Sequence, residues 1–172
     1  MSSQTQEEQV LALASSASLL RARDVAALSL PTIILSRLVK DGRLRRVGRG
    51  VYARPDRPLS EHISLAEVAL RVPRGVICLL SALHIHGLGT QAPHQIWLAI
   101  PQNSPTPRFE RPSLRPVRMS GPALTEGIQS MRIDGLDVPV FNAAKTIADC
   151  FKYRNKIGID VEVVNFAAEY RD

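Results

Sequence analysis

The sequence predicts an α+β fold: an N-terminal winged helix-turn-helix followed by an α+β C-terminal domain with a small, mostly antiparallel sheet. Two observations lead to this prediction. A polar-faced helix runs directly into a basic hairpin within residues 29–58, and helices alternate with strand-like segments after residue 58. Two prolines and three charged residues at 54–58 are typical of a linker. We therefore expect domains at residues 1–58 and 59–172.

Residues 4–28 predict two helices joined by a short link. Glu7 and Glu8 lie in the opening turns of residues 4–18, where acids interact favourably with the helix dipole. The inner face of this helix is expected to hold Val10, Leu11, Leu13 and Ala14. Residues 21–28 predict a second, shorter helix, whose inward residues would be Val25, Ala26 and Leu28.

The third helix is expected between Pro31, which suits a first helical turn, and Gly42, which suits the position just past a helix end. Its apolar stripe consists of Leu35, Leu38 and Val39. The opposite face carries Thr32, Ile33, Ser36, Arg37 and Lys40. A helix with this polar face, placed before a hairpin, is the layout of a recognition helix and its wing.

The wing is predicted as a strand over residues 43–47, a turn at 48–50 and a return strand over 51–54. Leu44 and Val47 break strict alternation, and a β-bulge would restore it. Residues 1–58 hold ten Arg and Lys against five acids, a net charge of +5, whereas the whole chain is only +6. A local basic excess is typical of phosphate binding. A merely solvated basic hairpin is the alternative, but it leaves the polar helix face unexplained.

We expect the basic side chains to contact DNA phosphates, with Arg49 at the wing tip entering a minor groove. The phosphate-contacting set is Lys40, Arg43, Arg45, Arg46 and Arg49. Base edges are expected to meet Thr32, Ser36 and Arg37, while Ile33 faces a thymine methyl.

The second half predicts helices and a small sheet. Residues 65–72 and the nearly all-apolar residues 76–86 predict helices, and residues 95–100 and 115–119 predict strands. Asp134-Gly135 predicts a two-residue hairpin turn within residues 131–138. Asn142 is expected to cap a helix over 143–153, followed by a last helix over 160–169. The inward residues of the capped helix would be Ala144, Ile147, Ala148 and Phe151.

Other classes of protein find little support. No apolar run approaches the ~20 residues that span a bilayer, and Cys78 and Cys150 lie in apolar segments, as expected of buried thiols in the cytoplasm. His84 and His86 are spaced i, i+2, which turns them to different faces of a helix, so we expect no metal. No phosphate-binding glycine loop, triad or carboxylate cluster indicates a cofactor or an enzyme.

Four segments resemble the AbiEi family, the antitoxins of type IV abortive-infection toxin–antitoxin systems. They are GRLRRVGRGVYARP (42–55), VICLLSALHIHGL (76–88), IWLAIP (96–101) and AKTIADCFKYRNKIG (144–158). The resemblance implies a winged helix that binds the operon's own promoter and a C-terminal domain without enzymatic activity. It also implies a nucleotidyltransferase-like toxin, countered without a stable complex. Family members usually continue through an Ala/Leu-rich helix, whereas this chain ends in IDVEVVNFAAEYRD, so we expect a shortened C-terminal domain.

Two readings of function remain open at this point. The leading one is a sequence-specific DNA-binding autorepressor that acts on inverted repeats of double-stranded DNA as a homodimer and also serves as an antitoxin. The alternative is a winged helix that grips a cognate toxin or another protein. The candidate antitoxin surface is Lys145, Asp149, Lys152 and Arg154. An ordinary solvated or locally paired helix face explains the same residues.

Overall fold

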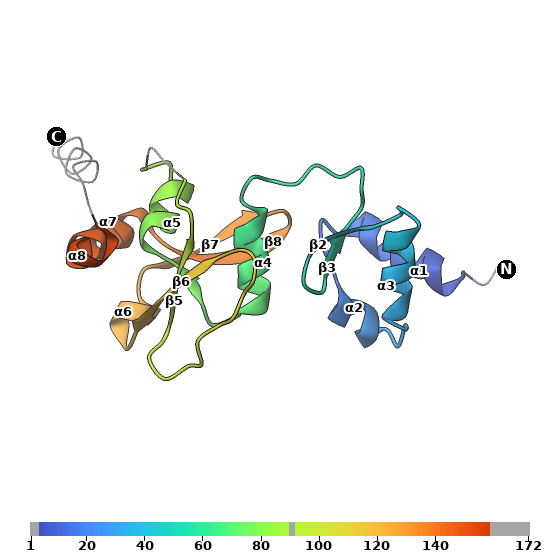
Figure 1. The fold of residues 1–172 in the computed structure, drawn as a ribbon, viewed down its shortest axis with the longest axis horizontal. Helices are drawn as coiled ribbons and strands as arrows, with labels where there is room; N and C mark the ends of the chain where they lie inside the picture. Colours follow the sequence, from blue (N-terminus) through green and yellow to red (C-terminus); the bar gives the residue numbers. More distant parts are fainter. Residues whose placement is uncertain (1–3, 90–91, 159–172) are drawn as a thin grey trace. The chain divides into compact units, whose positions relative to one another are not determined.

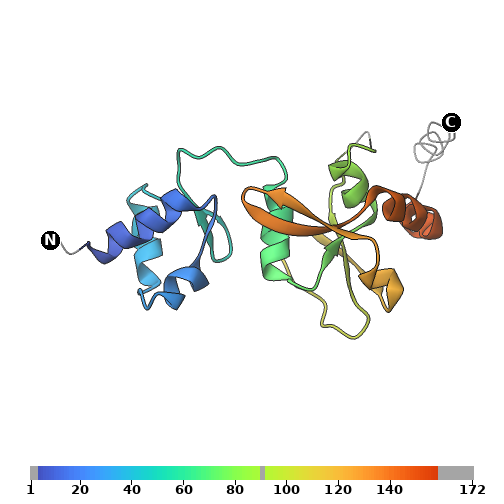
Figure 2. The same ribbon diagram turned by 180° about the vertical axis from the view of Figure 1, so that it is seen from behind.

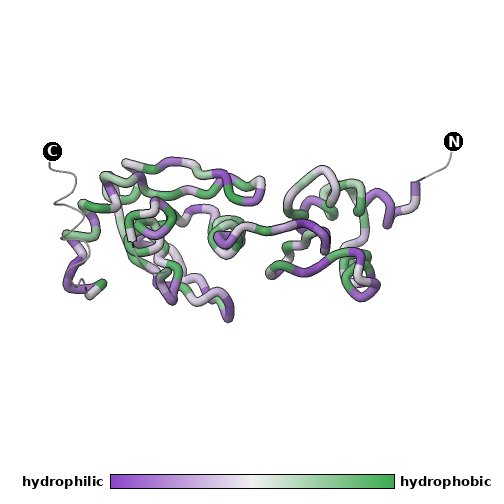
Figure 3. Tube along the Cα trace, turned by 90° about the horizontal axis from the view of Figure 1, so that it is seen from above, coloured by the Kyte–Doolittle hydropathy of each residue, from purple (hydrophilic) through white to green (hydrophobic). Residues whose placement is uncertain are grey.

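The computed structural model describes residues 4–89 and 92–158, which divide into two compact units. One unit consists of the described residues up to Ile63 together with Arg132–Leu136. The other consists of Ser64–Met131 and the described residues from Asp137 onward. Short hydrophobic and hydrophilic stretches alternate along both (Figure 3), as expected of amphipathic elements. None of the helices within the described residues is long and apolar enough to cross a membrane.

The N-terminal unit is a winged helix-turn-helix, as predicted. It contains α1 (Gln6–Ser16), α2 (Ala22–Ala27) and α3 (Ile33–Lys40), followed by the hairpin of β2 (Arg45–Gly48) and β3 (Val51–Ala53) (Figure 1). A short strand that was not predicted, β1 (Leu20–Arg21), pairs antiparallel with β3, so the sheet order is β1-β3-β2. Leu20 is buried there, because a strand paired at the edge of this sheet turns it into the core.

Local chemistry explains where these helices begin and end. The Thr5 hydroxyl accepts a hydrogen bond from the Glu8 N–H at 3.2 Å, and the Glu8 carboxylate accepts one from the Thr5 N–H at 2.7 Å. This capping box satisfies two donors at the start of α1. Gly42 follows α3 with φ of +73°, a conformation that glycine adopts without strain. The core between α1 and α3 is built from Val10, Ala14, Ile34, Leu35 and Leu38.

The predicted β-bulge lies in the wing. Arg46 pairs with Tyr52, but Gly48 pairs with the adjacent Val51, so the register shifts by one residue between them. Val47 is the extra residue on β2, and it accounts for the broken alternation of the sequence. Leu44, Val51 and Ala53 are buried, whereas Arg46 and Arg49 are exposed.

The C-terminal unit is α+β and its five-stranded sheet is mixed, with the order β6-β5-β4-β8-β7. Its strands are β4 (Val76–Ile77), β5 (Ile96–Pro101), β6 (Leu114–Met119), β7 (Ile128–Ile133) and β8 (Leu136–Phe141). Its helices are α4 (Ile63–Arg71), α5 (Leu79–Ile85), α6 (Pro122–Thr125), α7 (Ala143–Lys152) and α8 (Arg154–Ile157). β4 runs antiparallel to β5, whereas the pairs β4–β8 and β5–β6 are parallel. The β7–β8 hairpin turns at Asp134 and Gly135, both with positive φ, as predicted (Figure 2).

The prediction of one helix over residues 76–86 was wrong for its first residues. Val76 and Ile77 form β4 at the centre of the sheet, and only Leu79–Ile85 is helical. Val76 and Ile77 are both buried although they face opposite sides of the sheet, so the apolar pattern of β4 merges with that of the buried helix that follows. Leu79, with φ of +46°, marks the change of direction between the two elements.

Helix α7 begins where it was predicted but is rotated relative to the prediction. The Asn142 side chain accepts a hydrogen bond from the Lys145 N–H at 2.8 Å, as expected of an N-cap. The buried residues are Thr146, Asp149 and Cys150; of the residues predicted to face inward, Ile147 packs against the core, whereas Ala144, Ala148 and Phe151 are exposed. Alanine methyl groups expose little apolar area, so their periodicity weakly constrains the buried face. The helix predicted over 160–169 lies outside the described residues.

Candidate nucleic-acid interface

The outward face of α3 is the one that was predicted from the sequence. All five residues assigned to it are exposed, and these are Thr32, Ile33, Ser36, Arg37 and Lys40. Ile34, Leu35 and Leu38 are buried on the opposite side and hold the helix against the rest of the unit. Ser36 lies near the middle of the helix, and Arg37 and Lys40 lie in its last turn. The orientation of the face is therefore fixed by the core.

Three cations around this face have no partner among the described residues. Arg37 and Lys40 lie in the last turn of α3, and Arg49 lies at the tip of the wing. All three side chains are exposed, and no hydrogen bond or ion pair within the described part of the chain involves them. An exposed, unpaired cation can neutralise a DNA phosphate and so release a counter-ion that is condensed on the DNA.

Two further arginines are only loosely held. A guanidinium nitrogen of Arg43 lies 3.5 Å from a carboxylate oxygen of Glu7, and the Arg43 side chain is 48% exposed. Arg46 is exposed and donates from Nε to the Gly48 carbonyl at 3.2 Å, within its own hairpin. Contacts of this kind between exposed groups contribute little free energy, so both side chains are available to an outside anion.

Arg45 differs from the other wing arginines. It is half-buried and donates from Nη2 to the carbonyl of Arg57 at 2.6 Å. Its Nε is buried and has no hydrogen-bond partner among the described residues. Arg45 therefore ties β2 to the segment that follows the hairpin, and this is not the open position that the sequence predicted for a phosphate contact.

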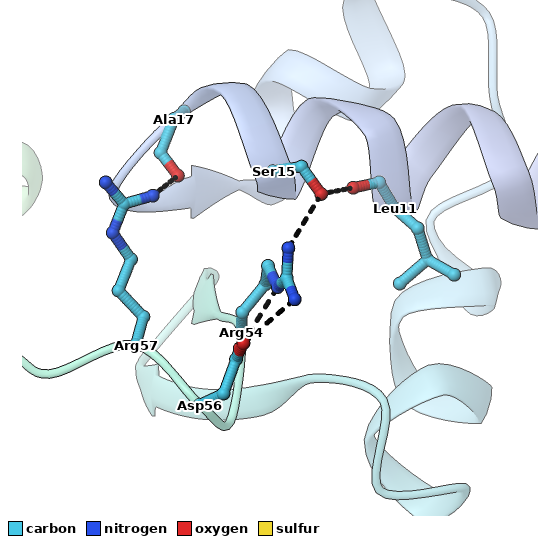
Figure 4. Close-up of polar contacts among 6 residues, drawn as sticks. All are labelled: Leu11, Ser15, Ala17, Arg54, Asp56 and Arg57. Carbon is cyan, nitrogen blue, oxygen red and sulfur yellow. Dashed lines mark hydrogen bonds and ion pairs between the residues drawn. The ribbon is translucent and has the colours of Figure 1, made fainter.

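The segment after β3 is fixed to α1 by two other arginines, as Figure 4 shows. Arg54 donates to both carboxylate oxygens of Asp56, at 2.9 and 3.0 Å, and to the Ser15 hydroxyl at 3.2 Å. Arg57 donates to the carbonyl of Ala17, the C-cap of α1, at 3.0 Å. Cations are favourable at a helix C-terminus, where carbonyls lack intrahelical partners.

Beside these contacts lies an open pocket of about 440 Å³, lined by Leu11, Ser15, Arg43, Arg54, Pro55 and Asp56. The sequence predicted a linker that starts at Arg54. In the structure, residues 54–57 are instead held on the winged helix by Ser15, Ala17 and Arg45.

The exposure of one residue near α3 contradicts the prediction from the sequence. Leu28, the C-cap of α2, was expected to point inward together with Ala26, and both are exposed. Leu28 is 56% exposed, as much as Ile33 on α3 at 57%. The short α2 buries only Val25, and a helix this short turns a narrow face to the core. No feature of the sequence pattern separates Leu28 from the buried leucines around it.

The four residues of the candidate antitoxin surface do not form one exposed surface. Lys145 Nζ lies 2.6 Å from a carboxylate oxygen of Asp149, and these side chains are only 18% and 11% exposed. The same ammonium group lies 4.5 Å from the centre of the Phe141 ring. Lys152 and Arg154 are exposed, and Arg154 donates to the Phe151 carbonyl at 2.9 Å. The prediction is thus corrected for Lys145 and Asp149, because an i, i+4 ion pair turned toward the core.

Both cysteines of this unit are buried, and His86 is half-buried. Burial, with the Asp149 carboxylate as a second cause, raises the pKa of the Cys78 thiol and raises that of Cys150 to about 12. His86 Nε2 lies 2.8 Å from the Phe141 carbonyl, across the core. Within the described residues, no group of three His, Cys, Asp or Glu side chains is arranged to hold a metal ion.

Part of the chain matches a known family. Residues 8–55, from α1 to just past the wing, match the sequence model of a family described as transcriptional regulator, AbiEi antitoxin. Over these residues the chain is similar to the AbiEi antitoxin family. The predicted resemblance is therefore confirmed, and the family description names a regulator, which is not a class of enzyme. A search of curated proteins found no match to the chain.

Proposed function

We propose that this AbiEi-family chain is a sequence-specific DNA-binding autorepressor and the antitoxin of a type IV toxin–antitoxin operon. The observation that supports the DNA-binding part most directly is the exposed polar face of α3, flanked by the unpaired cations Arg37, Lys40 and Arg49. The family description, a transcriptional regulator and antitoxin, supports the general role. The basic excess of residues 1–58 supports a polyanionic ligand.

In the proposed complex, α3 lies in a major groove and the wing lies along the adjacent backbone. Thr32, Ser36 and Arg37 contact base edges, because hydroxyl and guanidinium groups match their donor and acceptor patterns. Phosphates are contacted by Lys40, Arg43, Arg46 and Arg49, with Arg49 reaching into a minor groove. Arg45 supports the wing from inside through the Arg57 carbonyl.

Two copies are proposed to bind an inverted repeat in the operon's own promoter, since one winged helix covers only a short half-site. The C-terminal unit would help to hold the two copies together. Its antitoxin role is proposed to oppose a nucleotidyltransferase-like toxin without a stable complex. Of the candidate surface, the exposed Lys152 and Arg154 are the residues best able to reach another molecule.

The competing function is a winged helix that grips a protein partner. One observation favours this alternative: Leu28 and Ile33 expose apolar surface that a protein partner could cover. The unpaired Arg37, Lys40 and Arg49 favour DNA, because a protein-binding face has no need of them.

A gel-shift titration tests the proposal. The probe is duplex DNA from immediately upstream of the gene, compared with a scrambled duplex of equal length and composition at several salt concentrations. We expect tighter binding to the promoter and a fall of log K with log salt of about 0.9 per phosphate contacted. Equal binding to both duplexes, or affinity that ignores salt, would contradict sequence-specific DNA binding and favour the protein-binding alternative.

A further inference from the structure

Two large apolar side chains are exposed at the helix-turn-helix of the N-terminal unit. Within the described residues, the exposed large hydrophobic residues are Leu28, Ile33, Ile128 and Phe151, with exposed fractions of 56%, 57%, 44% and 37%. The two most exposed, Leu28 and Ile33, flank the turn between α2 and α3. Ile33 shares its helix face with Ser36, Arg37 and Lys40.

The backbone fixes both side chains outward. The N–H groups of Leu28 and Ser29 donate to the carbonyls of Val25 and Ala26 at 3.2 and 2.9 Å. Leu30 is 8% exposed, and its N–H donates to the Val25 carbonyl at 3.2 Å, so the middle of the turn is anchored in the core. On the far side, Ile34 is 3% exposed, which leaves Ile33 pointing away from the core.

The charges around these residues indicate what covers them. The cations on the same face, Arg37 and Lys40, have no acidic partner among the described residues. Asp24, the acid of α2, is already paired with Arg21 at 2.7 Å. An apolar protein partner would leave the cations without counter-charge, whereas a DNA duplex supplies phosphates. In the major groove, the apolar group that bases present is the 5-methyl of thymine.

We propose that Leu28 and Ile33 together read thymine 5-methyl groups in the major groove, so that the operator carries thymines opposite the α2–α3 turn. This inference rests on the proposed DNA-binding function. It adds Leu28 to the recognition surface and assigns that surface a base preference. Burial of one methyl against these side chains changes the dissociation constant by about fourfold.

The experiment removes the methyl groups from the DNA and leaves the protein unchanged. The footprinted promoter fragment is prepared with deoxyuridine in place of thymidine at individual positions within the footprint. For the wild-type chain we expect at least one substitution in each half-site to raise the dissociation constant about fourfold. In the Leu28→Ala and Ile33→Ala variants the same substitution should change it less than twofold. The matched control is Ile128→Ala, an exposed apolar residue of the other unit, which should keep the full fourfold response.

The outcomes separate the two proposals. Specific binding that is indifferent to deoxyuridine at every position would overturn the thymine inference and leave the DNA-binding proposal intact. Unchanged deoxyuridine sensitivity in both alanine variants, with thermal unfolding like that of the wild type, would also overturn it. A chain that does not distinguish the promoter from scrambled DNA would overturn the proposed function instead. Loss of self-association in Leu28→Ala, with DNA binding unaffected, would mark this patch as an interface between copies and overturn the inference.

Discussion

The basic residues of the winged helix differ in what holds them, and this difference decides their roles. Arg37, Lys40 and Arg49 are exposed and unpaired among the described residues. Arg45, Arg54 and Arg57 donate to groups of the same unit at 2.6–3.2 Å. A cation that is already bonded internally has less to gain from a phosphate, so net charge alone overstates the number of phosphate contacts in the proposed DNA complex.

Removing one of the unpaired cations should therefore change DNA binding in a way that depends on its position. Arg49→Ala should weaken binding to all sequences alike and reduce the salt slope by about 0.9. Arg37→Ala should cost roughly 1–3 kcal/mol on the promoter and relax discrimination between sequences. Fluorescence anisotropy at several salt concentrations measures both. The control is Arg108→Ala, an exposed arginine of the other unit; if it lowers the slope equally, the effect is one of net charge.

Neighbouring arginines of β2 allow a matched comparison of anchoring and binding. Arg45→Ala removes the hydrogen bond to the Arg57 carbonyl and should lower the free energy of unfolding by about 1–3 kcal/mol. Its salt slope should stay close to that of the wild type. Arg46→Ala, at an exposed side chain, should change stability by less than about 0.5 kcal/mol but reduce the slope. Urea unfolding followed by circular dichroism, together with salt titrations, would reveal a reversed pattern.

At the scale of elements, the N-cap of α7 makes a separate prediction for the C-terminal unit. Asn142→Ala removes the acceptor for the Lys145 N–H and should lower the free energy of unfolding by about 1 kcal/mol. Asn142→Asp retains an acceptor and should restore most of the stability. Chemical denaturation measures both variants. If Asn142→Asp and Asn142→Ala lower the free energy of unfolding equally, the cap hydrogen bond is not the source of the stability that Asn142 provides.

The elements that were predicted correctly are those whose residues carry a local constraint. Gly42 ends α3 and Asp134-Gly135 forms the hairpin turn, both at positive φ, and Asn142 caps α7 through its side-chain oxygen. The exposed face of α3 could be predicted from the sequence because the apolar residues on the opposite face are large. The strands β1 and β4 have two residues each, and pairing with distant strands creates them. A local pattern does not contain that information.

The candidate sites were predictable to different degrees for the same reason. Exposure of Arg37 and Arg49 follows from helix and hairpin periodicity. Anchoring of Arg45 depends on the Arg57 carbonyl, twelve residues away along the chain. Burial of Asp149 depends on how α7 packs, and the alanines of α7 gave the opposite rotation. Long-range packing therefore decides which charged residues of a predicted set remain available.

At the scale of the whole molecule, repression and antitoxicity should be separable. The double variant Arg37→Ala and Arg49→Ala should derepress the promoter yet protect cells when supplied from an unrelated promoter. Lys152→Glu combined with Arg154→Glu should repress normally and lose protection. Lys145 is left unchanged, because reversing its charge would place two carboxylates together at a largely buried site. Co-expression with the toxin and a promoter reporter measures both activities.

Matched protein levels and circular dichroism are the controls for this experiment. If every variant that loses repression also loses protection, the two activities depend on one surface and the model of separate functions is wrong.

The buried Cys78, Cys150 and Trp97 of the C-terminal unit provide probes of that unit alone. The chain has no other cysteine or tryptophan, so thiol-labelling kinetics and indole fluorescence report only on the C-terminal unit. With thiol pKa values raised by burial, modification by a maleimide requires the unit to open first. Labelling rates measured with and without promoter DNA therefore show whether DNA binding changes the opening of this unit. An unchanged labelling rate means that the C-terminal unit opens independently of the winged helix. A slower labelling rate means that DNA bound to the winged helix stabilises the C-terminal unit.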